Sequence, residues 1–245
     1  MTVSLISAIA MSLMLVVALA FFSVSMAKRI RVMLAGKPDV RWDRPAKRAF
    51  EMLKVAFAQS RMFKEPGPGI MHAFIFWGFL VLLFRSASLI GRAYAPEWSS
   101  WTLFWFCPTL DGWYAILKDI TELVVLLMIV WALFRRLVVR PKRLENSFSA
   151  FLILGFISYL MISDFIYDAS RFALVSIGGV VPDTMAARIS HEREWSPIGA
   201  MVAGWIDGLS PGALKAMVQV FFWSHVGVLL VFLNEDIGRS KKKPP

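Results

Sequence analysis

The sequence predicts an all-α integral membrane protein, a bundle of five transmembrane helices with the N-terminus outside and the C-terminus in the cytoplasm. Two observations lead to this prediction. Hydrophobic residues make up 58% of the 245-residue chain and charged residues only 18%, which is little charge for a soluble domain. Most Lys and Arg residues also fall in a few segments between apolar stretches, as is typical of cytoplasmic loops.

Five stretches hold the roughly 20 apolar residues that a membrane-spanning helix needs. We expect the helices at about 3–27, 69–91, 113–134, 147–178 and 212–234. The first is not a secretory signal, because its basic residues follow the apolar run instead of preceding it. The helical domain would cover 1–234 and leave a basic cytoplasmic tail at 235–245. Segment 45–63 mixes apolar and basic residues, which predicts an amphipathic helix at the cytoplasmic interface.

The orientation follows from the distribution of Lys and Arg. Segments 28–68, 135–146 and the tail after 234 hold eleven, five and four of them, twenty of the 27 in the chain. Because positive residues stay on the cytoplasmic side, these three segments are predicted to lie there. The net charge of +10 then reflects loops that face anionic lipid, so we expect membrane lipid, and not nucleic acid, as the partner of these charges.

Two of the three histidines lie inside predicted membrane helices. His72 is near the cytoplasmic start of the second helix and His225 is within the fifth, whereas His191 falls in an outer loop. Polar side chains are costly in lipid, so intramembrane histidines are candidates for function. Two neutral imidazoles can bind a haem iron from opposite faces, but each could equally donate a hydrogen bond to a neighbouring helix. The residues alone leave these two interpretations open.

The surroundings of the two histidines carry a resemblance. The stretches PGPGIMHAFIFWGFLVLL and FFWSHVGVLLVFLN, with SDFIYDASR between them, resemble the membrane domain of a family of iron–sulfur oxidoreductases. These proteins have an N-terminal region similar to the gamma (cytochrome b) subunit of respiratory nitrate reductase, followed by a part that resembles heterodisulfide reductase. The resemblance covers essentially the whole chain.

The resemblance implies a cofactor and a function. His72 and His225 would be the axial ligands of a b-type haem. The chain would relay electrons between a cytoplasmic iron–sulfur or electron-transfer flavoprotein partner and the menaquinone pool, in a bacterial-type cytoplasmic (inner) membrane. It would act as an electron-transfer subunit without a complete active site, since we find no nucleophile triad, phosphate-binding loop or zinc signature, and Cys107 is the single cysteine.

Two departures from the family pattern define the alternatives. The nitrate reductase subunit holds two haems with four histidines, whereas this sequence offers two histidines in the membrane, so we expect one haem, with none or two as alternatives. After FLN the chain reads EDIGRSKKKPP, without further histidines or cluster-binding cysteines, which suggests a stand-alone or truncated subunit. The rival function is a haem-free membrane anchor that recruits a redox partner. A transporter is a third interpretation, weakened by the lack of an inverted repeat.

Several charged residues lie at predicted membrane depth. Arg85 is in the second helix, and Asp164, Asp168 and Arg171 share one face of the fourth. One interpretation is an internal ion-pair network. In the functional interpretation, Arg85 and Arg171 pair with haem propionates, while Asp164 and Asp168, together with His191, handle the protons of a quinone.

Two further charged groups are predicted to face water. Lys118, Asp119 and Glu122 at the outer end of the third helix are expected to form a solvated face. The HEREW stretch at 191–195 is expected to be an exposed cluster in an outer loop, although it could release protons from a quinol.

Overall fold

The computed structural model describes residues 5–36, 43–94, 104, 106–141, 147–178 and 180–234. Every regular element within these ranges is a helix, which confirms the all-α class. The long helices are α1 (Leu5–Leu34), α3 (Pro66–Arg92), α4 (Pro108–Phe134), α5 (Phe148–Ser176) and α8 (Pro211–Leu233). The shorter ones are α2 (Pro45–Met52), α6 (Asp183–Glu194) and α7 (Pro197–Ile206). The predicted tail 235–245 lies outside the described residues.

Four of the long helices, α1, α3, α5 and α8, are long and apolar enough to cross a membrane. The chain therefore fits a multi-pass membrane protein, but the predicted count of five is not reached. The difference is α4, which is as long as α3 but carries Lys118, Asp119 and Glu122 near its middle. The crossing of α4 and the orientation of the bundle stay predictions.

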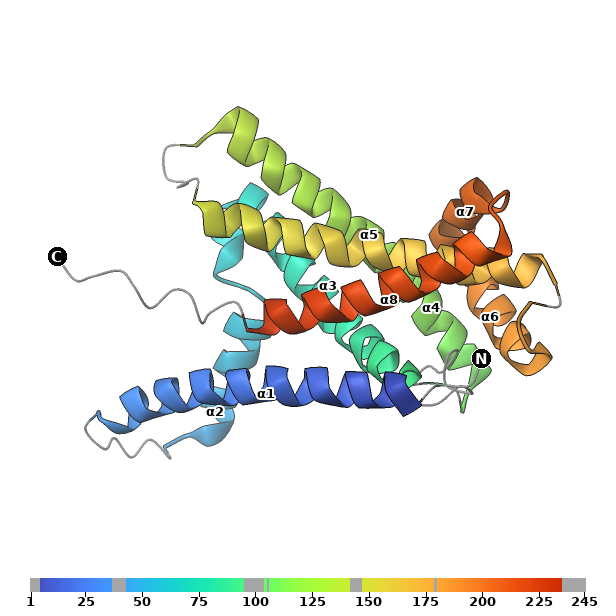
Figure 1. Cartoon of the computed structure of the whole chain (residues 1–245). Helices are drawn as coiled ribbons and strands as arrows, with labels where there is room; N and C mark the ends of the chain where they lie inside the picture. The colour runs from blue at the N-terminus through green and yellow to red at the C-terminus, as the bar shows by residue number, and fades with distance from the viewer. Residues whose placement is uncertain are drawn as a thin grey trace.

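Figure 1 shows how the helices are arranged. The start of α1 lies at the same end of the molecule as α6 and α7, which we call the α6–α7 end. The opposite end, which we call the α2 end, holds α2, the start of α3 and the last turns of α1 and α8. The basic residues that close α1 therefore lie at the same end as the basic helix α2.

Helix α5 is the centre of the bundle. It packs against α4, α7 and α8, and most of its second half is buried. Small residues bring neighbouring helices close, because a Cβ on Gly78 of α3 would lie 2.3 Å from a methyl carbon of Val125 on α4. Close helix contacts through small residues are typical of helix pairs in membranes.

The predicted amphipathic helix 45–63 is divided into pieces. Helix α2 continues into the π-helical turn η1 (Leu53–Phe57), and the 3-10 turn η2 (Met62–Lys64) follows directly before α3. The η1 turn is attached to α3, because the indole Nε1 of Trp77 donates a 2.8 Å hydrogen bond to the carbonyl of Phe57. The break lies at Gln59, whose φ of 53° is left-handed and so interrupts a right-handed helix.

Helices α6 and α7 pack as a cap on the end of α5. Phe172 and Ala169 of α5 form a core with Ile189 of α6 and Ala203 of α7. Asp119 of α4 holds the start of α7, accepting hydrogen bonds from the backbone N–H groups of Ile198 at 2.7 Å and Gly199 at 3.0 Å. A carboxylate in this position satisfies free N–H groups and the positive end of the helix dipole.

Candidate functional site

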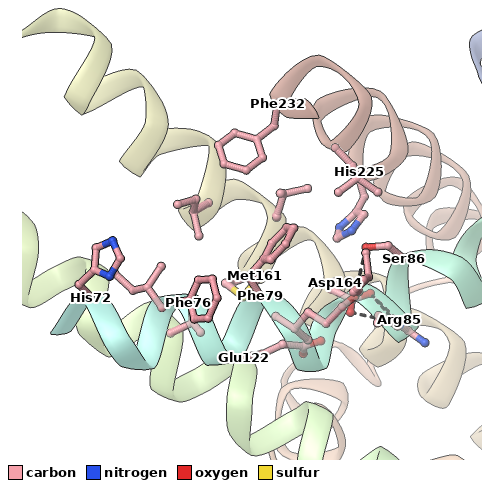
Figure 2. A pocket seen from close by; sticks show the side chains of 17 residues that line it. His72, Phe76, Phe79, Arg85, Ser86, Glu122, Met161, Asp164, His225 and Phe232 are labelled. Carbon is pink, nitrogen blue, oxygen red and sulfur yellow. Dashed lines mark hydrogen bonds and ion pairs between the residues drawn. The ribbon is translucent and has the colours of Figure 1, made fainter. Parts of the chain in front are cut away.

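A cavity of about 370 Å³ lies between α3, α4, α5 and α8. Its wall is mostly aliphatic and aromatic, with side chains such as Phe76, Phe79, Leu160 and Leu229. The polar side chains on the wall are six: His72, Arg85, Ser86, Glu122, Asp164 and His225. Figure 2 shows them around the cavity. An apolar pocket of this size with a few convergent polar groups is typical of a small-molecule site.

His225 is held in a defined orientation. It is buried, and its Nδ1 lies 2.9 Å from Oγ of Ser163. The hydroxyl of Ser163 donates its single proton to the carbonyl of Leu160 at 3.1 Å. With the hydroxyl turned to Leu160, Oγ accepts from Nδ1–H, and in that tautomer Nε2 of His225 is free to accept a hydrogen bond or bind a metal. The wall position of His225 makes Nε2 the ligand-binding atom that we assign to it.

His72 lines the same cavity at its other end. Its side chain is exposed, and Figure 2 shows it well apart from His225. His225 contacts Ser163, which is next to Asp164 on α5. Arg85 of α3 binds Asp164 and so lies near the depth of His225. Arg85 follows His72 by 13 residues on α3. At 1.5 Å per residue this is about 20 Å along the helix axis. The structure thus brings the two predicted haem ligands to one cavity but does not present both imidazoles to one iron.

A buried ion network closes the cavity towards the α6–α7 end. Its eight members are at most 5% exposed: Arg85, Arg92, Lys118, Glu122, Asp164, Asp168, Arg171 and Glu192. Arg85 is its centre, donating to both carboxylate oxygens of Asp164 at 2.9 Å and to Asp168 at 2.6 Å. The predicted internal network of Arg85, Asp164, Asp168 and Arg171 is therefore present. Arg85 and Asp164 face the cavity, whereas Asp168 and Arg171 are not part of its wall.

The network is larger than the sequence indicated, because α4 and α6 contribute to it. Lys118 of α4 donates to Asp168 of α5. Glu192 of α6 accepts from Arg85 at 3.2 Å and from Arg171 at 3.0 Å, and it pairs with Arg92 at 3.4 Å. Charges buried in this way are tolerated because each has partners of opposite sign.

The expectation of exposed charges was wrong for α4 and, in the HEREW stretch, for Glu192, whereas Glu194 is exposed. Lys118, Asp119 and Glu122 are at most 2% exposed, so they form no solvated face, and Glu192 of the HEREW stretch is buried as well. Burial alone would raise the pKa of Glu192, but the guanidinium groups of Arg171 and Arg92 lower that pKa to about 2. The sequence carried a signal for this burial, because the three charged residues of α4 lie inside an otherwise apolar stretch. Charged side chains are costly at such a position and usually face the bundle interior.

His191 belongs to the cap and not to the cavity. It is half-buried, and its Nε2 lies 3.1 Å from the carbonyl of Pro108 at the start of α4. Its ring also packs against Trp195. The structure thus assigns His191 a contact between α6 and α4, and its predicted part in quinone protonation is left as a prediction.

No group of three or more His, Cys, Asp or Glu side chains with the arrangement of a metal site occurs in the described part of the chain. The chain also has only Cys107, so it cannot supply the four cysteines of an iron–sulfur cluster. The cofactor candidates are therefore His225, through its free Nε2, and His72 at the far end of the cavity.

The chain is similar to two curated proteins. It is 28% identical over 213 residues to "EtfAB:quinone oxidoreductase" of Syntrophomonas wolfei subsp. wolfei, a match that covers 84% of this chain and 28% of that protein. It is 26% identical over 180 residues to "Probable iron-sulfur-binding oxidoreductase FadF" of Bacillus subtilis, covering 72% of this chain and 23% of that protein. The matched part spans only about a quarter of each curated relative. Neither a protein-family profile nor a solved structure matches the chain.

These relatives support one part of the resemblance seen in the sequence. Their names fit a membrane oxidoreductase of the heterodisulfide-reductase-like kind, with links to quinone in one relative and to iron–sulfur binding in the other. Neither name refers to a haem or to nitrate reductase, so the cytochrome b part of the resemblance stays a prediction.

Proposed function

We propose that the chain is the membrane part of a quinone-linked electron-transfer oxidoreductase and that the cavity between α3, α4, α5 and α8 is its quinone site. One observation carries the proposal: His225, Glu122, Arg85 and Asp164 gather at one end of an otherwise apolar cavity. The name of the Syntrophomonas wolfei relative supports quinone as the ligand.

The cavity suits the chemistry of a quinone. A quinone combines a flat apolar ring with two oxygens that need hydrogen-bond partners once the ring is buried. Phe76, Phe79 and Leu229 provide an apolar wall for the ring or its tail. Nε2 of His225 would accept a hydrogen bond from a hydroxyl of the reduced form.

The finer features of the proposal come from the sequence. The quinone would be menaquinone of a bacterial-type inner membrane, and the electrons would come from a cytoplasmic iron–sulfur or electron-transfer flavoprotein partner. Five crossings, including α4, with the α2 end in the cytoplasm would place the basic residues of α1 and α2 where an acidic partner can dock.

A b-type haem held by His72 and His225 is the second candidate. The tautomer of His225 favours it, because Nε2 is the atom that a haem iron binds and Nδ1 is fixed by Ser163. The distance of His72 along α3 does not fit a shared iron in this arrangement. A haem-free membrane anchor would leave the cavity without either ligand.

Quinone binding is tested with the purified chain in detergent and the fluorescent quinol analogue 2-heptyl-4-hydroxyquinoline N-oxide. We expect saturable quenching of the analogue, competed by menadione. His225→Ala should weaken binding at least about tenfold, which corresponds to a lost buried hydrogen bond of about 1.4 kcal/mol. His191→Ala is the matched control, since this histidine lies outside the cavity, and it should bind normally. No saturable binding by the wild type would refute the quinone site.

The haem question needs a separate measurement on the same preparation. Protein made with ample haem is compared before and after reduction by dithionite. A b-type absorption band that is lost in both His72→Ala and His225→Ala would establish the second candidate, with a rearrangement of α3 against α8. No band would leave the quinone proposal standing and remove the haem.

A further inference from the structure

Glu122 differs from the other acids around the cavity. It is completely buried, it lies on the cavity wall beside the carboxyl of Asp164, and no donor among the described residues bonds its carboxylate oxygens. The nearest cation, Nζ of Lys118, lies 3.8 Å from Oε1. That ammonium group is engaged by Asp168. A buried carboxylate without hydrogen-bond donors is unfavourable, so this group is suited to carrying a proton.

The other buried acids nearby are bound firmly by donors. Asp164 accepts from Nε and Nη2 of Arg85 at 2.9 Å. Asp168 accepts from Arg85, Lys118 and Arg171. Asp119 is held by the backbone of α7. Protonation of any of these would break two or more bonds, whereas protonation of Glu122 breaks none.

The charge balance of the ion network points in the same direction. It contains four cations, and without Glu122 it contains three acids, namely Asp164, Asp168 and Glu192. One further negative charge neutralises it. That charge is either the carboxylate of Glu122 or a charge on a ligand at the polar end of the cavity. Transfer of a proton from Glu122 to such a ligand leaves the total charge unchanged, which avoids the cost of a net buried charge.

We propose that Glu122 is the proton-transfer residue of the cavity and exchanges its carboxyl proton with a ring oxygen of the bound quinone. This proposal rests on the proposed quinone site. Two electrons from the reduced iron–sulfur or flavoprotein partner and two protons convert the quinone to the quinol. Glu122 supplies one proton: its O–H bond breaks, an O–H bond forms on the ring oxygen, and the carboxylate stays beside Lys118. Water supplies the second proton and later reprotonates Glu122.

The groups that face Glu122 come from every helix around it. Lys118 lies on the same helix, Arg85 on α3, Asp164 on α5 and His225 on α8. Figure 2 shows the Glu122 side chain at the polar end of the cavity, near Arg85 and Asp164 and away from His72. Arg85 is committed to Asp164 and Asp168. Lys118 is therefore the cation that stabilises the carboxylate after the proton has left.

Infrared difference spectroscopy tests the proposal directly. The chain, loaded with menadione, is reduced and oxidised electrochemically in a thin-layer cell. We expect the stretching band of a protonated carboxyl to change with reduction, to shift when the chain carries isotope-labelled glutamate, and to be absent in Glu122→Gln. A band that is missing from the wild type, or that persists in Glu122→Gln, overturns the proposal. The isotope shift in the wild type decides whether a glutamate is involved even where the variant folds poorly.

Binding of the quinol analogue separates this proposal from the quinone site itself. Glu122→Gln should bind the analogue within about threefold of the wild type, whereas the rate of menadione reduction in the complex with its reduced iron–sulfur or flavoprotein partner should fall about 100-fold, as for the loss of a general acid. If the wild type binds no analogue, the quinone site fails. If Glu122→Gln binds and is reduced as fast as the wild type, the site stands and Glu122 is not its proton-transfer residue.

Discussion

Nδ1 of His225 on α8 lies 2.9 Å from Oγ of Ser163 on α5, and this contact orients the imidazole on the cavity wall. The hydroxyl of Ser163 also donates a hydrogen bond to the carbonyl of Leu160, so the contacts run from α8 into the backbone of α5. With the proton on Nδ1, the arrangement that holds α5 and α8 together leaves Nε2 as the acceptor of the imidazole.

Ser163→Ala should therefore weaken ligand binding while leaving the fold intact. Without the hydroxyl, the imidazole can rotate or place its proton on Nε2, and we expect the affinity for the quinol analogue to fall about five- to tenfold, in line with one hydrogen bond of about 1 kcal/mol. Fluorescence quenching measures this. The control is Ser158→Ala, because Ser158 lies on the same helix and bonds only the carbonyl of Leu154. Equal affinities in both variants would mean that Ser163 does not set the tautomer.

Removal of Arg85 should destabilise the bundle far more than removal of an exposed arginine. Arg85→Ala leaves Asp164 buried without its main donor, which typically costs about 3–5 kcal/mol. Arg48→Ala removes an exposed pair with Asp43, where about 0–1 kcal/mol is at stake. Thermal unfolding of both variants in the same detergent compares them. Similar midpoints for Arg85→Ala and the wild type would show that the ion network contributes little.

The sequence predicted the helices better than it predicted their charged contacts. The length of the apolar stretches alone located α3, α5 and α8. Lipid offers no hydrogen-bond partners to backbone N–H and C=O groups, and a helix satisfies these groups within one segment. The length of a stretch could not show that Glu122 and Glu192 are buried. Glu192 meets its partner Arg171 only once α5 and α6 have packed, and Glu122 meets Lys118 one helical turn away. The resemblance singled out His72 and His225, but only the packing of α3 against α8 shows that they lie at opposite ends of one cavity.

The attachment of α6 should depend on pH through Glu192. Its pKa is lowered to about 2 from an ordinary value of 4.5, so its pairing with Arg171 and Arg92 contributes fully above pH 4.5 and is lost as the pH falls towards about 2. We expect cleavage by the acid protease pepsin within α6 and α7 to increase over this range. In Glu192→Gln, cleavage should already be high at pH 4.5 and change little below it. A wild-type cleavage rate that stays constant over the range would contradict this role.

Gly78 and Val125 set the spacing of α3 and α4, the two helices that carry Arg85 and Glu122. A Cβ at position 78 would approach Cγ2 of Val125 to 2.3 Å, which is far inside van der Waals contact, so Gly78→Ala must push the helices apart. We expect a loss of about 1–3 kcal/mol in stability, seen as a lower unfolding midpoint, together with weaker binding of the quinol analogue. Val125→Ala removes the clashing methyl carbon and should restore part of both losses in the double variant. Losses in the two single variants that simply add in the double variant would show that the two side chains do not meet, and the spacing would then depend on other contacts.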